Sequence, residues 1–312
     1  MADNNKKKDD KKQNSDEYLK DYLGNNDYNG DGGDISNQHK NQNPNQSLGS
    51  AKDLKFLTID INELPCSYFY PAGTSVLVRA AEVGEIQAFS VVDDTNFYDL
   101  FEKVNHIVQS CVMLKFPDGS KKPYTHLIDG DRWYLLFVIR ELTFQKGNDL
   151  FATVGKTKIP IKRGFFTFHD MDDRIKKYYN KLAGNFTFET KIGNIEMAPP
   201  TMGLQKSFTD YMIKEAQAKR DLDESFLKIV PYTFPGRTSI TEEGIKKEYT
   251  KFKTLPIDLF QFLNQAIDKL SFGISGVKTL DESGMEVHSE EIFPDGISKL
   301  FVQPDAFDDF LK

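Results

Sequence analysis

Residues 127–144 read LIDGDRWYLLFVIRELTF, and this stretch decides how the rest of the chain can pack. Asp129 and Gly130 favour a turn, and the Asp131 carboxylate is placed to accept the free backbone N–H groups of a helix's first turn. The segment Trp133–Ile139 is apolar on every face, which predicts a helix buried inside a domain. It is too short to span a bilayer. A buried strand is the alternative interpretation, because periodicity does not separate the two in short apolar runs.

The composition limits the class of protein. A chain of 312 residues can hold one large domain or two modest ones. Its formal net charge of −7 argues against a general nucleic-acid binder, which would carry a basic face. The 25 Phe and 13 Tyr can fill a core or serve protein interfaces. Cys66 and Cys111 have neither metal-site nor disulfide spacing, and no signal peptide is seen, so we expect a soluble protein of a reducing compartment.

Both ends of the chain hold the candidate partner-binding residues. Residues 1–52 are dominated by Lys, Asp and Asn, and cannot bury enough apolar surface to order, so we predict a disordered arm. One group within it would share a helix face and could dock on a partner, although a sticky spot in a flexible tail is the alternative: Tyr18, Leu19, Tyr22 and Leu23. The acidic-aromatic tail at 304–312 supplies the other candidates: Phe307, Phe310 and Leu311.

Three motifs that resemble ligand sites are incomplete. Residues 27–38 begin like a calcium loop, but Gln38 stands where the bidentate Glu of position twelve belongs. Gly155-Lys156-Thr157 superficially matches a phosphate loop, but Leu150 replaces the required first glycine. The segment His169–Asp173 could hold a cation, although an acid-rich helix start is the ordinary explanation. We therefore predict no catalytic, metal-binding or cofactor-binding residue.

Hydrophobic periodicity and turn residues predict an α+β fold of β-hairpins and helices around the buried central helix, with a helical C-terminal part that carries a small β element. Asp93, Asp94 or Thr95 is expected to cap the helix at 96–112. The expected strands are 55–61 and 74–79, paired with each other, and 271–277 and 285–292; the expected hairpins are 150–161 and 186–197; the expected helices are 96–112, 170–182, 204–219, 221–229, 241–252 and 256–270.

The predicted domains are the arm at 1–52, an α+β core at 53–165, and a mainly helical domain at 166–312. Whether 146–235 is an insertion or a domain stays open.

Two segments resemble the baseplate hub and assembly proteins of T-even-type contractile-tailed phages. The first contains Leu64-Pro65, Tyr70-Pro71-Ala72-Gly73, Ser110-Cys111-Val112 and Gly130–Leu136. The second contains Ile267–Leu270, Phe293-Pro294-Asp295-Gly296-Ile297 and Leu300-Phe301-Val302. The likeness covers 54–145 and 240–304. Members of this family commonly carry a CxxC pair in the C-terminal β element, but 272–293 holds no cysteine, which removes the case for zinc.

The resemblance implies a bacteriophage virion protein of the tail baseplate, either structural or required for assembly, that acts through protein–protein contacts and is not an enzyme. The expected partners are other tail and baseplate proteins, with self-association in a symmetric assembly as one arrangement, and neither nucleic acid nor membrane. The expected location is the virion, and the host cytoplasm during assembly. One alternative is an assembly chaperone that never enters the particle. A metal-dependent hydrolase using His169–Asp173 is the other.

Overall fold

The predicted buried helix is α4 (Arg132–Thr143), in which every residue from Tyr134 to Arg140 is buried. The computed structural model describes residues 55–144, 150–191, 193–220 and 223–301. These residues all belong to one compact unit, Asp53–Lys312. The helix interpretation of the central stretch is therefore confirmed, and the strand alternative is wrong.

The described residues form eight α-helices and twelve strands, which confirms the α+β class. The other helices are α2 (Val83–Ser90), α3 (Phe97–Cys111), α5 (Asp173–Lys176), α6 (Met202–Gln217), α7 (Glu224–Ile229), α8 (Glu242–Phe252) and α9 (Ile257–Lys269). The strands are β1 (Leu57–Asp60), β2 (Ser75–Val78), β3 (Val112–Lys115), β4 (Lys121–Pro123), β5 (Phe151–Val154), β6 (Thr157–Pro160), β7 (Phe166–Phe168), β8 (Tyr179–Asn180), β9 (Asn185–Thr190), β10 (Gly193–Met197), β11 (Ile274–Leu280) and β12 (Glu286–Ser289).

The strands form four small antiparallel sheets, with the orders β1-β2-β3-β4, β10-β9-β8, β12-β11-β7 and β5-β6. The first sheet contains the predicted pair of strands, with Ile59 opposite Val76. Val76 in turn faces Leu114 of β3, and all three side chains are buried. Because alternate residues of a strand point to one face, these three lie on the face that packs into the core, where β2 contacts α4.

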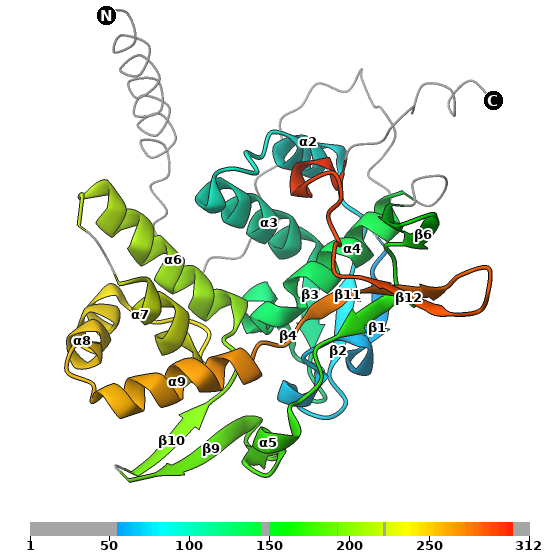
Figure 1. Ribbon diagram of the computed structural model, residues 1–312. Coiled ribbons are helices and arrows are strands. Elements are labelled where there is room, and N and C mark those ends of the chain that lie inside the picture. The colour runs from blue at the N-terminus through cyan, green and yellow to red at the C-terminus, as the bar shows by residue number, and fades with distance from the viewer. Residues whose placement is uncertain (1–54, 145–149, 192, 221–222, 302–312) are drawn as a thin grey trace, which may run out of the picture. The chain divides into compact units, whose positions relative to one another are not determined.

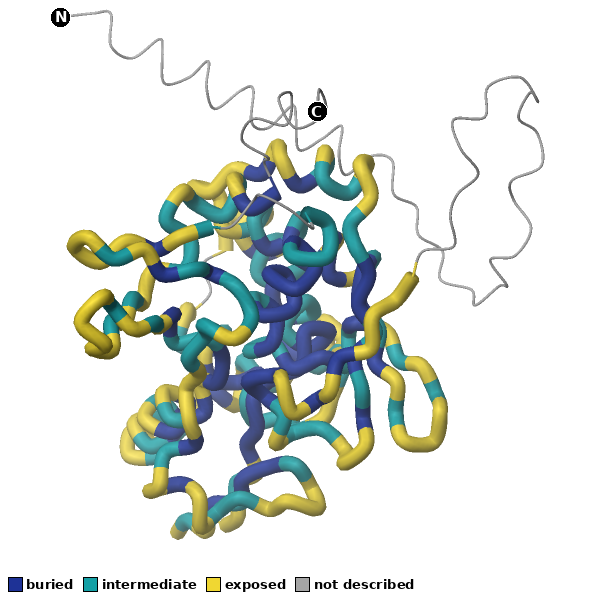
Figure 2. The backbone as a smooth tube through the Cα atoms, turned by 90° about the vertical axis from the view of Figure 1, so that its right-hand side faces the viewer, coloured by how far each residue is buried: buried dark blue, intermediate teal, exposed yellow. Residues whose placement is uncertain are grey.

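The buried apolar side chains fall into two clusters. Figure 2 shows the buried stretches of the backbone inside the described unit, with exposed stretches around them. The first surrounds α4 and takes most of its members from residues before 166, but it also contains Val277 and Leu300. The second is formed largely by α6 to α9 and by β9, but it also contains Cys66 and Ile128. Each cluster thus draws on both sides of the expected boundary near residue 166, and the division into 53–165 and 166–312 remains a prediction.

The C-terminal segment returns to α4 (Figure 1). The ring of Phe293 stacks on that of Phe137, with the centroids 5.2 Å apart and the planes 18° apart. It also meets Trp133 edge to face at 5.2 Å. Arg140 Nε donates a 2.7 Å hydrogen bond to the carbonyl of Leu300. Residues 130–140 and 293–300, far apart in the sequence, therefore form one packed joint.

Two of the local predictions that prove wrong concern helix boundaries. The helix expected at 170–182 is limited to α5, and the chain then turns into β8, because Tyr178 and Tyr179 pack their rings against Phe188 and Phe186 of β9. The cap of α3 is Asn96, whose Oδ1 accepts the first-turn N–H groups, one residue later than predicted. None of the helices in the described ranges has the length and apolar character needed to cross a membrane.

Candidate functional site

The predicted partner-binding residues all lie outside the described residues. In the N-terminal arm these are Tyr18, Leu19, Tyr22 and Leu23, and in the tail they are Phe307, Phe310 and Leu311. The incomplete calcium loop at 27–38 lies outside them as well. A candidate site among the described residues must therefore consist of other side chains.

The acidic cluster at His169–Asp173 is built as a helix start. Asp172 caps α5, because its Oδ1 accepts the backbone N–H of Arg174 at 2.8 Å. The same carboxylate pairs with the guanidinium of Arg174 and, at 3.1 Å, with Lys269 Nζ. The hydrogen bond from Arg174 holds the pKa of Asp172 well below its usual range. Two cations already satisfy this carboxylate, and no group of three potential metal ligands occurs in the described part of the chain.

A buried polar cluster lies where the cap of α4 was predicted. Asp131 is completely buried, and its side chain does not cap the helix. Instead Oδ1 accepts the backbone N–H of Cys66 at 2.8 Å, and Oδ2 accepts the hydroxyl of Tyr70 at 2.6 Å. That hydroxyl accepts the N–H of Ile128 at 2.8 Å. The predicted cap is wrong because donors more than 60 positions away in the sequence, at Cys66 and Tyr70, take the carboxylate.

Burial dominates the electrostatics of this cluster. Removal from water raises the pKa of Asp131 to about 7, against the lowering effect of the Tyr70 and Cys66 donors. Burial also raises the pKa of the Cys66 thiol and of the Tyr70 hydroxyl well above their ordinary values. A thiol that stays protonated is a poor nucleophile and a poor metal ligand. The cluster therefore joins the Cys66–Tyr70 segment to the start of α4.

Close backbone packing accompanies the cluster. A Cβ atom on Gly130 would lie 2.4 Å from the carbonyl oxygen of Phe272 and 2.7 Å from Cys66 Sγ. Only glycine fits at that distance. The absence of a side chain at Gly130 thus allows the backbone of Phe272, a member of the second apolar cluster, to approach the start of α4.

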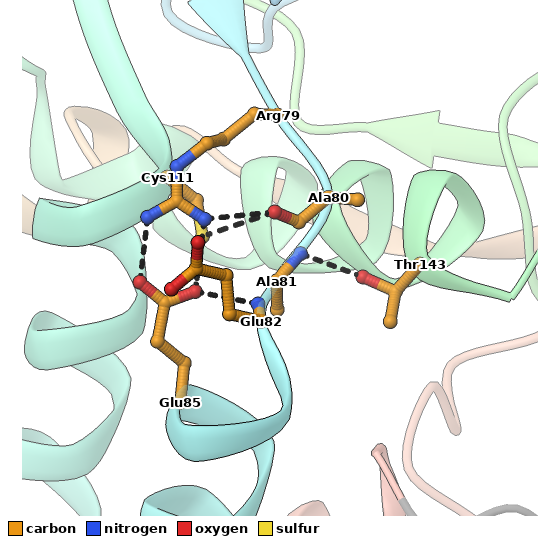
Figure 3. Close-up of polar contacts among 7 residues, drawn as sticks. All are labelled: Arg79, Ala80, Ala81, Glu82, Glu85, Cys111 and Thr143. Atoms are coloured by element: carbon orange, nitrogen blue, oxygen red, sulfur yellow. Dashed lines mark hydrogen bonds and ion pairs between the residues drawn. The ribbon is translucent and has the colours of Figure 1, made fainter. Parts of the chain in front are cut away.

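A second polar cluster connects the end of β2 to α2 (Figure 3). The guanidinium of Arg79 donates to both carboxylate oxygens of Glu85, at 2.6 and 2.9 Å, and to the carbonyl of Ala80 at 2.8 Å. Glu85 also accepts the N–H of Glu82 at 2.8 Å, which completes a capping box at the start of α2. The Arg79 guanidinium lowers the pKa of Glu85 against the effect of burial, so the pair remains charged.

The second cysteine belongs to this cluster. Cys111 Sγ lies 3.5 Å from Glu85 Oε2, and burial raises the pKa of its thiol to about 12. Nearby, the N–H of Ala81 donates to Thr143 Oγ1 at 2.9 Å and ties the chain to the end of α4. Figure 3 shows these residues converging from the segment between β2 and α2, and from α2, α3 and α4. This cluster therefore also joins separate elements of the fold.

Apolar side chains that are well exposed occur at turns and helix ends. Leu280 and Met285 flank the turn of the β11–β12 hairpin and are each 65% exposed. Leu182, in the turn between β8 and β9, is fully exposed. Beside it lies an open groove of about 720 Å³, lined by residues 177–182 together with Thr187 and Glu189. Large contiguous apolar patches mark surfaces that bind protein partners, and these exposed side chains are the described positions from which such a contact can be proposed.

The fold and these clusters define an α+β protein in which two polar clusters join segments that are distant in the sequence. Comparison with protein-family models, with curated protein sequences and with solved structures gives no match.

Proposed function

We propose that this chain is a structural or assembly protein of a contractile phage tail baseplate, and that it acts through contacts with other tail proteins. One observation carries the proposal: the two segments that resemble the family pack on each other. Phe293 from the second segment contacts Trp133 and Phe137 from the first. The resembling motifs therefore pack together in one core, which supports the proposal that both belong to one family fold.

The chemistry of the buried clusters also supports a role without catalysis. Asp131 and Cys66 are completely buried, and both are used in contacts between chain segments. The thiol of Cys111 is held protonated at neutral pH. Such groups stabilise a scaffold, and a scaffold is what a baseplate component contributes.

The β11–β12 hairpin is the contact that we propose among the described residues. Leu280 and Met285 stand at its tip, beside Asp281, Glu282 and Glu286. Figure 1 shows this hairpin projecting from the rest of the described unit. An apolar pair with an acidic border fits a tail protein that offers an apolar pocket with a basic rim. The Tyr18–Leu23 and Phe307–Leu311 segments remain proposed contacts as well.

Co-purification tests this proposal. The tagged full chain is co-expressed with the tail and baseplate proteins of the same phage, and the captured proteins are identified and quantified. We expect a defined tail protein to co-purify, and Leu280→Asp with Met285→Asp to reduce its recovery by about tenfold. Ile257→Asp, an equally exposed apolar position at the start of α9, is the matched control and should leave recovery unchanged. If no tail or baseplate protein co-purifies, the proposal is wrong.

A further inference from the structure

The groove lined by residues 177–182, Thr187 and Glu189 combines exposed lysines with half-buried aromatic rings. Tyr178 and Tyr179 are half-buried in it, whereas Lys177 and Lys181 are exposed. Leu182, at its border, is fully exposed. The chain as a whole is acidic, with a formal net charge of −7, yet this groove carries two lysines and a single acid, Glu189.

One wall of the groove is the edge of a strand. β8 pairs with β9 only at Tyr179 with Phe186 and Asn180 with Asn185. The last backbone bond on this side joins the N–H of Thr187 to the carbonyl of Tyr178 at 2.9 Å. β9 runs on past this bond to Glu189, and within the described ranges no strand continues β8 alongside it. A sheet edge of this kind accepts an extended segment as an added strand.

The end of this chain has the matching chemistry. Residues 304–311 read PDAFDDFL, with three aspartates and three large apolar side chains in eight residues. The aspartates complement Lys177 and Lys181, and the apolar groups complement Leu182 and the two tyrosines. Eleven residues, 302–312, follow the last described residue. Fully extended, such a segment spans roughly 35 Å, which is ample for a strand beside β9.

The position of Phe301 favours an occupant from another copy. Phe301 packs against Phe89 of α2, with ring centroids 5.0 Å apart. Figure 1 shows α2 and β9 at opposite ends of the described unit. Phe301, the last described residue, therefore lies at the opposite end of the unit from β9, and this placement favours the groove of a second copy as the binding site of the tail.

We propose that residues 304–312 of one copy bind the groove of a second copy, add a strand to β9 and link the copies head to tail. Asp308 and Asp309 pair with Lys177 and Lys181 in this contact. A head-to-tail contact is heterologous and generates a ring when the rotation closes. The inference rests on the proposed function for its use, since a baseplate is a symmetric assembly, but its test needs only the purified chain.

A charge-reversal experiment tests the contact. The first variant carries Lys177→Glu and Lys181→Glu in the groove, and the second carries Asp308→Lys and Asp309→Lys in the tail. A control variant carries Lys115→Glu and Lys247→Glu, two exposed lysines outside the groove. The association of each full-length protein, and of the two reversed variants mixed in equal amounts, is measured by sedimentation over a range of concentrations and salt.

We expect the unmodified chain and the control to associate, with an affinity that falls as salt rises. Each reversed variant alone should lose about tenfold or more in affinity. The mixture should regain association, because each reversed surface then meets its opposite charge on the other variant.

A chain that stays monomeric at every concentration would overturn the proposal. Association that neither reversal weakens, or that the mixture does not restore, would overturn it as well. A monomer whose tail is protected from carboxypeptidase only when Lys177 and Lys181 are present would assign the groove to the tail of the same copy and contradict the link between copies. None of these results depends on the capture of tail proteins, so either proposal can fail alone.

Discussion

The hydroxyl of Tyr70 donates a 2.6 Å hydrogen bond to Oδ2 of Asp131 and accepts a 2.8 Å bond from the N–H of Ile128. A single atom thus joins the segment before β2 to both sides of the turn that starts α4. Because the carboxylate is completely buried, it has no access to solvent if this bond is lost.

Replacing Tyr70 by Phe should therefore be costly. The change keeps the ring but leaves a buried carboxylate oxygen and the Ile128 N–H without their partner, and we expect the free energy of unfolding to fall by about 1–3 kcal/mol. Denaturant unfolding measures this. Tyr68→Phe makes the same chemical change at a half-exposed ring and should cost less than about 0.5 kcal/mol. Equal losses in the two variants would contradict a special role for Tyr70.

The same carboxyl group gives stability a dependence on pH. Asp131 has a pKa of about 7 in the folded protein, above its ordinary value of 3.8, so the folded state binds its proton more tightly. The stabilisation that comes from this tighter proton binding is complete below pH 3.8 and is lost as the pH rises through about 7.

Comparison with Asp131→Asn isolates the effect from other titrating groups. The free energy of unfolding of the unmodified chain, minus that of the variant, should fall by about 2 kcal/mol between about pH 5 and pH 8. Parallel curves for the two proteins would show that Asp131 does not titrate in this range.

Gly130 should not tolerate a methyl group. A Cβ there would lie 2.4 Å from the backbone oxygen of Phe272, which cannot move alone, so Gly130→Ala should lower the free energy of unfolding by about 3 kcal/mol. Gly84→Ala is the opposite case, because nothing lies within 4 Å of the new atom and the position is in α2. It should raise stability by about 0.5–1 kcal/mol. A harmless Gly130→Ala would mean that the close approach to Phe272 is absent.

The joint between Phe293 and α4 can be followed by fluorescence. Trp133 is the single tryptophan of the chain and meets the Phe293 ring at 5.2 Å. Phe293→Ala opens this contact, so we expect Trp133 emission to shift to longer wavelength and the free energy of unfolding to fall by about 2–4 kcal/mol. Phe97→Ala, at a ring that is 58% exposed, should change both much less. Unchanged Trp133 emission in Phe293→Ala would contradict the packing of the two resembling segments on each other.

Asn105 offers a stabilising change. It is buried in α3, and neither atom of its amide has a hydrogen-bond partner among the described side chains and backbone. Asn105→Leu replaces two unsatisfied polar atoms by methyl groups in a side chain of similar shape. It should raise the free energy of unfolding by about 1 kcal/mol. A loss of stability in thermal and denaturant unfolding would mean that the amide is needed where it is.

The α+β class and most of the elements could be predicted from the sequence, because their signals are local. The apolar run in 127–144 forms α4, and the turn at 155–156 closes the predicted hairpin of β5 and β6. The helix predicted at 170–182 failed for a tertiary reason: Tyr178 and Tyr179 gain more by packing on β9 than by continuing α5.

The polar clusters could not be predicted, because their partners come from distant segments. Asp131 follows a turn and precedes an apolar run, which is the pattern of a helix cap, and nothing local shows that Cys66 and Tyr70 take its oxygens. The groove likewise depends on how far β8 extends along β9, which no motif shows. The position of Asp131 just ahead of the apolar run Trp133–Ile139 is the sequence feature that points to a buried polar network.

Quantitative mass spectrometry of gradient-purified phage particles tests the central proposal most directly. We expect the full chain to be present in the particles at a fixed copy number that matches the rotational symmetry of the baseplate. Presence in infected-cell lysate and absence from finished particles would contradict a structural role and identify an assembly chaperone. Absence from both would contradict the baseplate proposal altogether.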